Sequence, residues 1–161
     1  MINGQLDEVN LNILLILQEN ARTPFTQIAQ QVGVSDATVY LRVKKMEKMG
    51  LIEKYNTFLN EEKLGHPIVT YILISVEPGA VEEVCTKLTE LHEIYEISEI
   101  HEQYDILLKV RGSSLENIRN TLIQKIRSIP NILSSEAYTV YKTWKRDMGF
   151  RIAGLQDDVL R

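Results

Sequence analysis

Hydrophobic residues in the first third of the chain recur at the spacing of amphipathic helices. The first run is Leu6, Val9, Ile13, Ile16 and Leu17, whose members lie mostly three or four positions apart and so fall on one helical face. Two shorter runs follow, first Phe25, Ile28, Ala29 and Val32, and then Val39, Val43 and Met46. This pattern predicts three helices within residues 6–52.

Glycine and polar residues at the ends of these runs are typical of helix boundaries. Gly33 is placed to end the second helix, Ser35 to cap the third, and Gly50 to end it. Beyond Gly50, residues 51–55 and 57–59 are interpreted as the two arms of a small hairpin, or wing.

Near Asn60 the pattern changes to alternating strands and helices. Strands are predicted at residues 68–76, 94–100, 106–110 and 132–141. One helix is predicted on Val81, Val84, Leu88 and Leu91, and another after the cap Ser113-Ser114, ending before Pro130. The order β-α-β-β-α-β is that of a ferredoxin-like unit. The expected organisation is a helical domain (1–59), a linker (60–67), an α/β domain (68–142) and a tail (143–161).

The three N-terminal helices contain a helix-turn-helix pattern. Between Phe25 and Val39 a short helix meets the next through a turn at Gly33, and the small residue Ala29 allows close approach. Such a unit presents the first turns of its second helix to the major groove of DNA. The candidate DNA-binding residues are Ser35, Asp36, Ala37, Thr38, Tyr40, Leu41, Arg42, Lys44 and Lys45, with Lys48 as a further phosphate contact.

The charge distribution favours a nucleic-acid interface on this helix. The formal net charge of −4 argues weakly against nucleic acid, but the excess of acid lies entirely in residues 61–161. Four of the six basic residues in the first 60 positions fall between Arg42 and Lys48, and a local strip matters more for phosphate binding than the total charge. The alternative is a plain three-helix bundle, in which these lysines only favour the helix dipole.

Two longer motifs span the helices and their turns. They read Leu6-Asp7-x5-Ile13-Leu14 and Ile28-Ala29-x3-Gly33-Val34-Ser35-x2-Thr38-Val39-x2-Arg42-Val43-x2-Met46-Glu47-x2-Gly50-x-Ile52. With the βαββαβ half, the chain resembles the leucine-responsive regulatory protein (Lrp)/AsnC family of transcription regulators over residues 6–142. The resemblance implies an α+β protein with a winged helix-turn-helix and a ferredoxin-like effector domain. It also implies homodimers built through the C-terminal sheets, assembly to octamers, and amino acids as effectors.

The loop His101-Glu102-Gln103-Tyr104-Asp105 is the candidate effector site. Similar proteins have Gly-x-(Tyr/Phe)-Asp here, so Tyr104 and Asp105 match, whereas Glu102 stands where glycine is expected. Thr139 and Tyr141 resemble effector-lining positions on one side of the last strand. Alternatively, Asp105 is a turn residue that bonds its own backbone, and His101 a partly buried residue with one hydrogen bond. The polar groups favour glutamine, asparagine or a basic amino acid as the effector.

The predicted sheet carries apolar side chains on both of its faces. One set is Ile72, Ile74, Val76, Ile106, Leu108 and Val110, and the opposite set includes Leu73, Leu107 and aromatic residues. Because two helices cover only one face, a second copy is expected to bury the other, unless a helix from the tail does so. A dimer would bind a pseudo-palindromic double-stranded DNA operator.

Several function classes are not expected. No apolar run approaches the ~20 residues of a membrane span, and the N-terminus has no signal-peptide pattern. With one cysteine, Cys85, and three scattered histidines, we expect no disulfide, no metal, no cofactor and a cytoplasmic location. No catalytic constellation is present. Two alternatives stay open: an enzyme similar to haem-pathway decarboxylases, using His101 and Arg111, and an assembly module whose helical domain docks protein.

Overall fold

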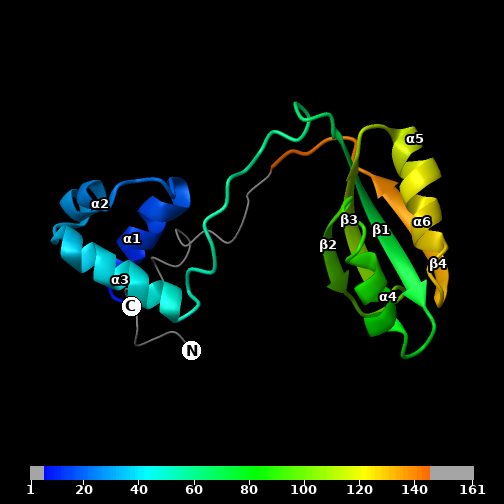
Figure 1. Cartoon of the computed structure of the whole chain (residues 1–161), viewed down its shortest axis with the longest axis horizontal. Coiled ribbons are helices and arrows are strands. Elements are labelled where there is room, and N and C mark those ends of the chain that lie inside the picture. Colours follow the sequence, from blue (N-terminus) through cyan, green and yellow to red (C-terminus); the bar gives the residue numbers. More distant parts are fainter. Residues whose placement is uncertain (1–5, 146–161) are drawn as a thin grey trace. The chain divides into compact units, whose positions relative to one another are not determined.

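The computed structural model describes residues 6–145, which divide into two compact units (Figure 1). The first consists of residues 6–58 and the second of residues 59–145. Each unit has its own hydrophobic core and is described by itself. No helix within residues 6–145 is long and apolar enough to cross a bilayer.

Three helices form the first unit: α1 (Glu8–Glu19), α2 (Phe25–Val32) and α3 (Asp36–Lys48). The predicted apolar runs supply the core, in which Ile13, Ile28 and Val39 are fully buried. The predicted boundaries are also present. Gly33 adopts a left-handed conformation (φ +73°) after α2, and Ser35 Oγ accepts a hydrogen bond from the Thr38 amide at 3.1 Å. The helix-turn-helix prediction is therefore confirmed.

The prediction of a wing after α3 is wrong. Residues 51–60 contain no strand, and the amides of Leu51 and Ile52 donate to the Met46 carbonyl at 3.0 and 3.3 Å, which completes the end of α3. The two expected arms leave only Asn56 between them, whereas the tightest common hairpin needs a two-residue loop. The chain from Glu53 to Asn60 is exposed and irregular.

The second unit is an antiparallel sheet with helices in the predicted β-α-β-β-α-β order. Its strands are β1 (Ile68–Val76), β2 (Ile94–Glu99), β3 (Ile106–Gly112) and β4 (Ile132–Thr139), arranged in space as β2-β3-β1-β4. Helix α4 (Val81–Leu88) follows β1. The segments α5 (Leu115–Asn117), η1 (Ile118–Leu122) and α6 (Ile123–Arg127) form one helical stretch before β4. The α+β, ferredoxin-like prediction is confirmed.

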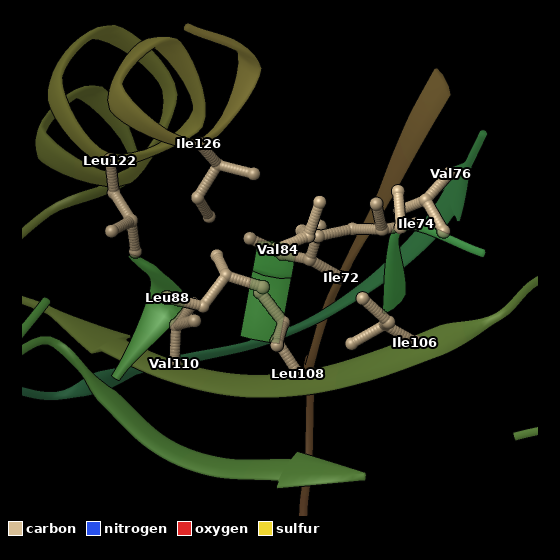
Figure 2. Packing of buried hydrophobic residues seen from close by; sticks show 11 residues of the cluster. Ile72, Ile74, Val76, Val84, Leu88, Ile106, Leu108, Val110, Leu122 and Ile126 are labelled. Atoms are coloured by element: carbon tan, nitrogen blue, oxygen red, sulfur yellow. The ribbon is translucent and has the colours of Figure 1, made fainter. Parts of the chain in front are cut away.

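The helices cover one face of this sheet, and the hydrophobic core lies between the helices and the sheet (Figure 2). Even-numbered residues of β1 and β3, such as Ile72 and Leu108, pack against Leu88 from α4 and against Leu122 and Ile126. All five are at most 1% exposed, and burying such a side chain contributes about 1.5–3 kcal/mol. Odd-numbered residues lie on the opposite face, here called the open face. It carries Tyr71, Leu73, Leu107 and Lys109, joined by Glu136 and Tyr138 through the strand register.

Several elements of the second unit depart from the predictions: β2 ends at Glu99 rather than at residue 100, and β3 extends to Gly112 rather than to residue 110. The helix expected to run as one α-helix contains the π-helical turn Ile118–Leu122, although Ser114 caps its start as predicted. The end of β3 runs directly against this turn, since a Cβ at Gly112 would lie 2.6 Å from Ile118 Cγ1. Strand β4 ends at Thr139 rather than at residue 141. Only one further ladder bond follows, from the Val140 amide to the Val69 carbonyl.

Candidate DNA interface and ligand site

Helix α3 turns one face to the core of its unit and the opposite face outwards. Val39, Val43 and Met46 are buried. The exposed residues are Ser35, Asp36, Ala37, Tyr40, Leu41, Lys44, Lys45 and Lys48, whereas Thr38 and Arg42 are half-buried. The predicted DNA-binding residues thus lie on the helix side away from the core, or at its flank.

Arg42 is bound to helix α1. Its Nη1 lies 2.7 and 2.6 Å from the two carboxylate oxygens of Asp7 and 2.8 Å from Asn10 Oδ1. Asp7 also caps α1 by accepting the Asn10 amide at 2.8 Å. The hydrogen bond from Arg42, with that from the Asn10 amide, lowers the pKa of Asp7. Arg42 therefore joins α3 to the start of α1, a function that its position in the sequence pattern does not reveal.

Three other predicted interface residues, Ser35, Thr38 and Lys44, have partners within the unit. The hydroxyls of Ser35 and Thr38 lie 2.8 Å apart. Lys44 Nζ donates to Glu47 at 2.6 Å, and Glu47 also accepts from the Tyr55 hydroxyl at 3.1 Å. These bonds raise the pKa of Lys44 and lower that of Glu47. Lys44 lies in an exposed ion pair, which exchanges readily with other partners because solvent screens such pairs.

Lys45, Lys48 and Tyr40 complete the outward side of α3. Within residues 6–145 no ion pair involves Lys45 or Lys48. The Tyr40 ring rests on Phe25 of α2, with ring centroids 6.3 Å apart and planes tilted by 60°. The helix therefore presents two ammonium groups and one positioned aromatic ring, which suit phosphates and a base edge respectively.

In the second unit, Asp105 fixes the candidate effector loop to strand β1. Its Oδ2 accepts from the Val76 amide at 2.9 Å, and its own amide donates to the Ile74 carbonyl at 2.9 Å. The Ser75 hydroxyl donates to the Gln103 carbonyl at 3.3 Å. The Asp105 carboxylate thus bonds a neighbouring strand, contrary to the alternative considered from the sequence, and only the Asp105 carbonyl closes the turn, accepting from the Ile100 amide at 2.8 Å. His101 is exposed, so its interpretation as a partly buried residue is also wrong.

Glu102 has the backbone conformation of a glycine. Its φ of +123° lies in a region that residues with a side chain rarely adopt. The resemblance places glycine at this position, and the loop keeps that geometry despite the glutamate. The exposed side chain of Glu102 therefore adds a carboxylate to a loop whose backbone has a glycine-like conformation.

The sequence analysis missed a cluster beside this loop. Glu136 accepts hydrogen bonds from the hydroxyls of Tyr138, at 2.6 Å, and Tyr104. The bond to Glu136 raises the pKa of Tyr104 to about 12. The alternation of β4 would place Glu136 and Tyr138 on one face, but its weak apolar pattern does not say which face.

Thr139 and Tyr141 were expected from the sequence to lie on one side of the last strand. The structure shows that they do not. The Thr139 hydroxyl lies 3.2 Å from that of Thr70, on the face that the helices cover. Tyr141 lies beyond the end of β4 and is fully exposed. The expectation was wrong because the last ladder contact comes before residue 141 and Thr139 pairs with a buried position.

Arg111 connects β3 to the segment before the sheet. It is only 6% exposed, and its Nη2 lies 3.0 Å from Glu61 Oε1. The guanidinium also lies 5.5 Å from the centre of the Tyr95 ring. Arg111 was a reactive group in the enzyme alternative, but this geometry makes it the anchor of the turn that begins near Glu61.

Family models match both units. A model of the AsnC-type helix-turn-helix domain matches residues 6–47, and a model of the Lrp/AsnC ligand binding domain matches residues 69–150. The chain belongs to the Lrp/AsnC family of transcriptional regulators. The resemblance drawn from the two sequence motifs is confirmed.

Relatives in this family cover nearly the whole chain. An uncharacterised HTH-type transcriptional regulator from Pyrococcus furiosus is 39% identical, covering 86% of this chain and 95% of the relative. HTH-type transcriptional regulator FL11 from Pyrococcus abyssi is 34% identical, covering 87% and 92%. The family and these relatives are DNA-binding transcriptional regulators and not enzymes, and the chain is a transcription regulator of that family.

Solved structures agree with this assignment. E. coli AsnC is similar with a TM-score of 0.84 and 30% identity, covering 88% of this chain and 96% of that one. A transcriptional regulator from Neisseria meningitidis, solved as an L-Met complex, shares the fold with a TM-score of 0.88 and 20% identity, covering 94% and 99%. The Lrp/AsnC fold therefore extends through both units.

Proposed function

We propose that the outward side of α3 binds the major groove of a double-stranded DNA operator. Lys45 and Lys48 contact phosphates, and Lys44 joins them when its exposed pair with Glu47 opens. Ala37, Tyr40 and Leu41 face base edges. Ser35, Asp36 and Thr38 lie at the turn that enters the groove. The observation that carries this proposal is the exposure of Tyr40, Lys45 and Lys48 on one side of the second helix of the motif.

In this proposal Arg42 positions the helix and makes no primary phosphate contact. Its guanidinium is held by Asp7 and Asn10. Release of the guanidinium would break its hydrogen bonds to Asp7 and Asn10. Arg42 therefore fixes the position of α3, and the lysines supply the positive charge that contacts the DNA phosphates.

We further propose a homodimer formed through the open face, with octamers as the higher assembly that the family resemblance implies. Leu73 and Leu107 are paired in the register of that face, and Tyr71 and Tyr138 lie beside them. A second copy would remove this surface from water. Two helix-turn-helix units related by a two-fold axis favour a pseudo-palindromic operator.

We propose an amino acid as the effector, bound at the loop of residues 101–105. The Asp105 amide is engaged with Ile74, so the amides of Gln103 and Tyr104 are the candidates for the ligand carboxylate. Asp105 or Glu102 accepts from the ligand ammonium, and His101 adds a polar contact. In place of Thr139 and Tyr141, we assign Glu136 and Tyr138 to the side-chain pocket. The L-Met complex of the Neisseria meningitidis regulator supports the ligand class.

Among glutamine, asparagine and a basic amino acid, the Glu136 carboxylate favours the basic one. Calorimetric titration of the full-length protein with each standard amino acid tests this choice. Asp105→Ala and Glu136→Gln should weaken binding, and Thr139→Ala serves as the matched control that should not. Absence of any binding at millimolar concentration, or an unchanged affinity in Asp105→Ala, would remove the ligand from this loop.

The effector must bind one arrangement of the protein better than another, since equal affinity for both would shift nothing. DNA affinity measured with and without the bound amino acid gives that difference directly. Because the partner is chromosomal DNA, we propose that the protein acts in the cytoplasm.

A further inference from the structure

Three exposed residues form a contiguous apolar strip on α3. Ala37 lies three positions before Tyr40 and four before Leu41, so its side chain neighbours both of theirs on the helix surface. Tyr40 is 49% exposed and Leu41 is 66% exposed. Within residues 6–145 the Tyr40 hydroxyl makes no hydrogen bond. Apolar surface in the middle of a polar helix face indicates a binding function.

The strip has a fixed shape because Phe25 supports Tyr40 from the side. Phe25 is half-buried, packs against the core of the first unit and contacts the Tyr40 ring with centroids 6.3 Å apart. Aromatic pairs at this distance stabilise each other beyond what their buried area contributes. The ring of Tyr40 is therefore held in one place before any DNA arrives.

Charge complementarity identifies duplex DNA as the occupant of this surface. Lys44, Lys45 and Lys48 lie one to two turns further along the same helix and are all exposed. The apolar strip would face base edges in the groove, and the three ammonium groups that follow it would face the neighbouring phosphates. A protein partner would have to leave these charges unpaired or supply acids for each.

The chemistry of the strip selects a particular base. In the major groove only thymine presents a methyl group, and apolar side chains recognise that methyl. The neighbouring Thr38 hydroxyl is already engaged with Ser35 at 2.8 Å. We infer that Ala37, Tyr40 and Leu41 read thymine methyl groups, and that Phe25 is a positioning residue for Tyr40. This inference rests on the proposed DNA interface.

The test uses the full-length wild-type protein and a duplex that it selects from a random-sequence library. Each thymidine in that duplex is replaced in turn by deoxyuridine, which removes only the methyl group. At the contacted positions the affinity should fall about fourfold per methyl, the equivalent of one buried methylene. An affinity that is unchanged by replacement at every thymidine would overturn the inference, although the duplex would still be a ligand.

Variants assign the methyl contacts to side chains. In Tyr40→Ala, and likewise in Leu41→Ala, the replacement of thymidine by deoxyuridine should no longer change the affinity at one position. At the other contacted positions the replacement should still lower the affinity. Lys48→Ala is the matched control: it should weaken both duplexes by the same factor. If Tyr40→Ala and Leu41→Ala retain the full wild-type ratio at all positions, the strip does not read the methyl groups.

Phe25→Leu tests positioning separately from folding. It should lower the thymine-to-uracil ratio only at the Tyr40 position, with the salt dependence of binding unchanged, and Phe25→Tyr should restore the ratio. An equal loss of affinity for both duplexes would make Phe25 merely structural. If the library yields no enriched duplex at all, the proposed DNA interface fails and this inference with it, whereas enrichment without methyl sensitivity overturns only the inference.

Discussion

Arg42 and Asp7 lie 35 positions apart in the sequence, yet the Arg42 guanidinium is 2.6 Å from the Asp7 carboxylate. Asp7 caps helix α1 with the same carboxylate. One side chain therefore both caps the first helix and holds α3 against it. Arg42, which the sequence pattern suggests as a phosphate contact, thus also links these two helices of its unit.

Asp7→Asn separates these two functions of Asp7. Asparagine caps helices as well as aspartate does, so this variant keeps the cap and loses only the ion pair. We expect a loss of about 1 kcal/mol at neutral pH, the upper end for partly exposed pairs. Asp7→Ala should lose about 1 kcal/mol more, because the cap is also removed. Urea unfolding measures both, and equal losses in the two variants would contradict the assignment.

The same pair makes a pH prediction. The pKa of Asp7 is lowered in the folded protein from its ordinary value of 3.8. The unfolded chain therefore takes up this proton at higher pH than the folded one, so the stabilisation is present above 3.8 and is lost as pH falls below it. The stability difference between wild type and Asp7→Asn should shrink below about pH 4. A difference that stays constant down to pH 2 would show that the pair does not stabilise the fold.

The backbone conformation of Glu102 is strained, and relief of that strain should stabilise the second unit. Because its φ is +123°, Glu102→Gly should stabilise the second unit by about 1 kcal/mol. Glu102→Ala is the matched control, since it removes the charge but keeps the strained conformation. Chemical unfolding followed in the second unit should separate the two variants. If both behave alike, charge and not backbone conformation determines the effect.

Tyr104 and Glu136 make a prediction at alkaline pH. The Glu136 carboxylate disfavours the phenolate and raises the pKa of Tyr104 to about 12. This contribution to stability is complete below the ordinary tyrosine pKa of 10.0 and is lost as pH rises towards 12. Glu136→Gln should return the Tyr104 pKa towards 10.0. Ultraviolet titration of tyrosinate, with Tyr104→Phe to assign the step, checks this, and an unshifted step in Glu136→Gln would contradict the contact.

Arg111 and Glu61 test the anchor of the segment before the sheet. Arg111 is 6% exposed, so Glu61→Ala should leave a buried charge without its carboxylate partner, beside the Tyr95 ring. We expect a loss of about 2 kcal/mol, below the 3–5 kcal/mol of fully buried pairs because Glu61 is partly exposed. The double variant Glu61→Ala/Arg111→Met should recover part of that loss. Additive losses in the double variant would show that the two side chains are not coupled.

The sequence predicts elements where local chemistry decides them. Strand β1 has the predicted bounds because β-branched and aromatic residues dominate it, and the Ser35 cap and the Gly33 turn each follow from a single residue. Features that depend on distant partners were missed. The bond from Arg42 to Asp7 requires two helices to meet, and the Glu136 cluster requires the register of β4, which its mixed polar sequence does not specify.

The wing was wrong for a related reason. The apolar residues of the two expected arms suggested strands, but Leu51 and Ile52 bond back to Met46, and Asn56 alone does not make a hairpin loop. The π-helical turn Ile118–Leu122 has the same hydrophobic spacing as an ordinary helix, so periodicity does not distinguish them.

The salt dependence of DNA binding tests the central claim most directly. The full-length protein and the variant Lys44→Ala/Lys45→Ala/Lys48→Ala are compared on the selected duplex, with Lys63→Ala/Lys87→Ala/Lys125→Ala in the second unit as the matched control. The account predicts that the α3 variant flattens the slope of log Kd against log salt by ~0.9 for each lost phosphate contact, and that the control keeps the wild-type slope. An unchanged slope in a folded α3 variant would contradict the claim that this helix meets the DNA backbone.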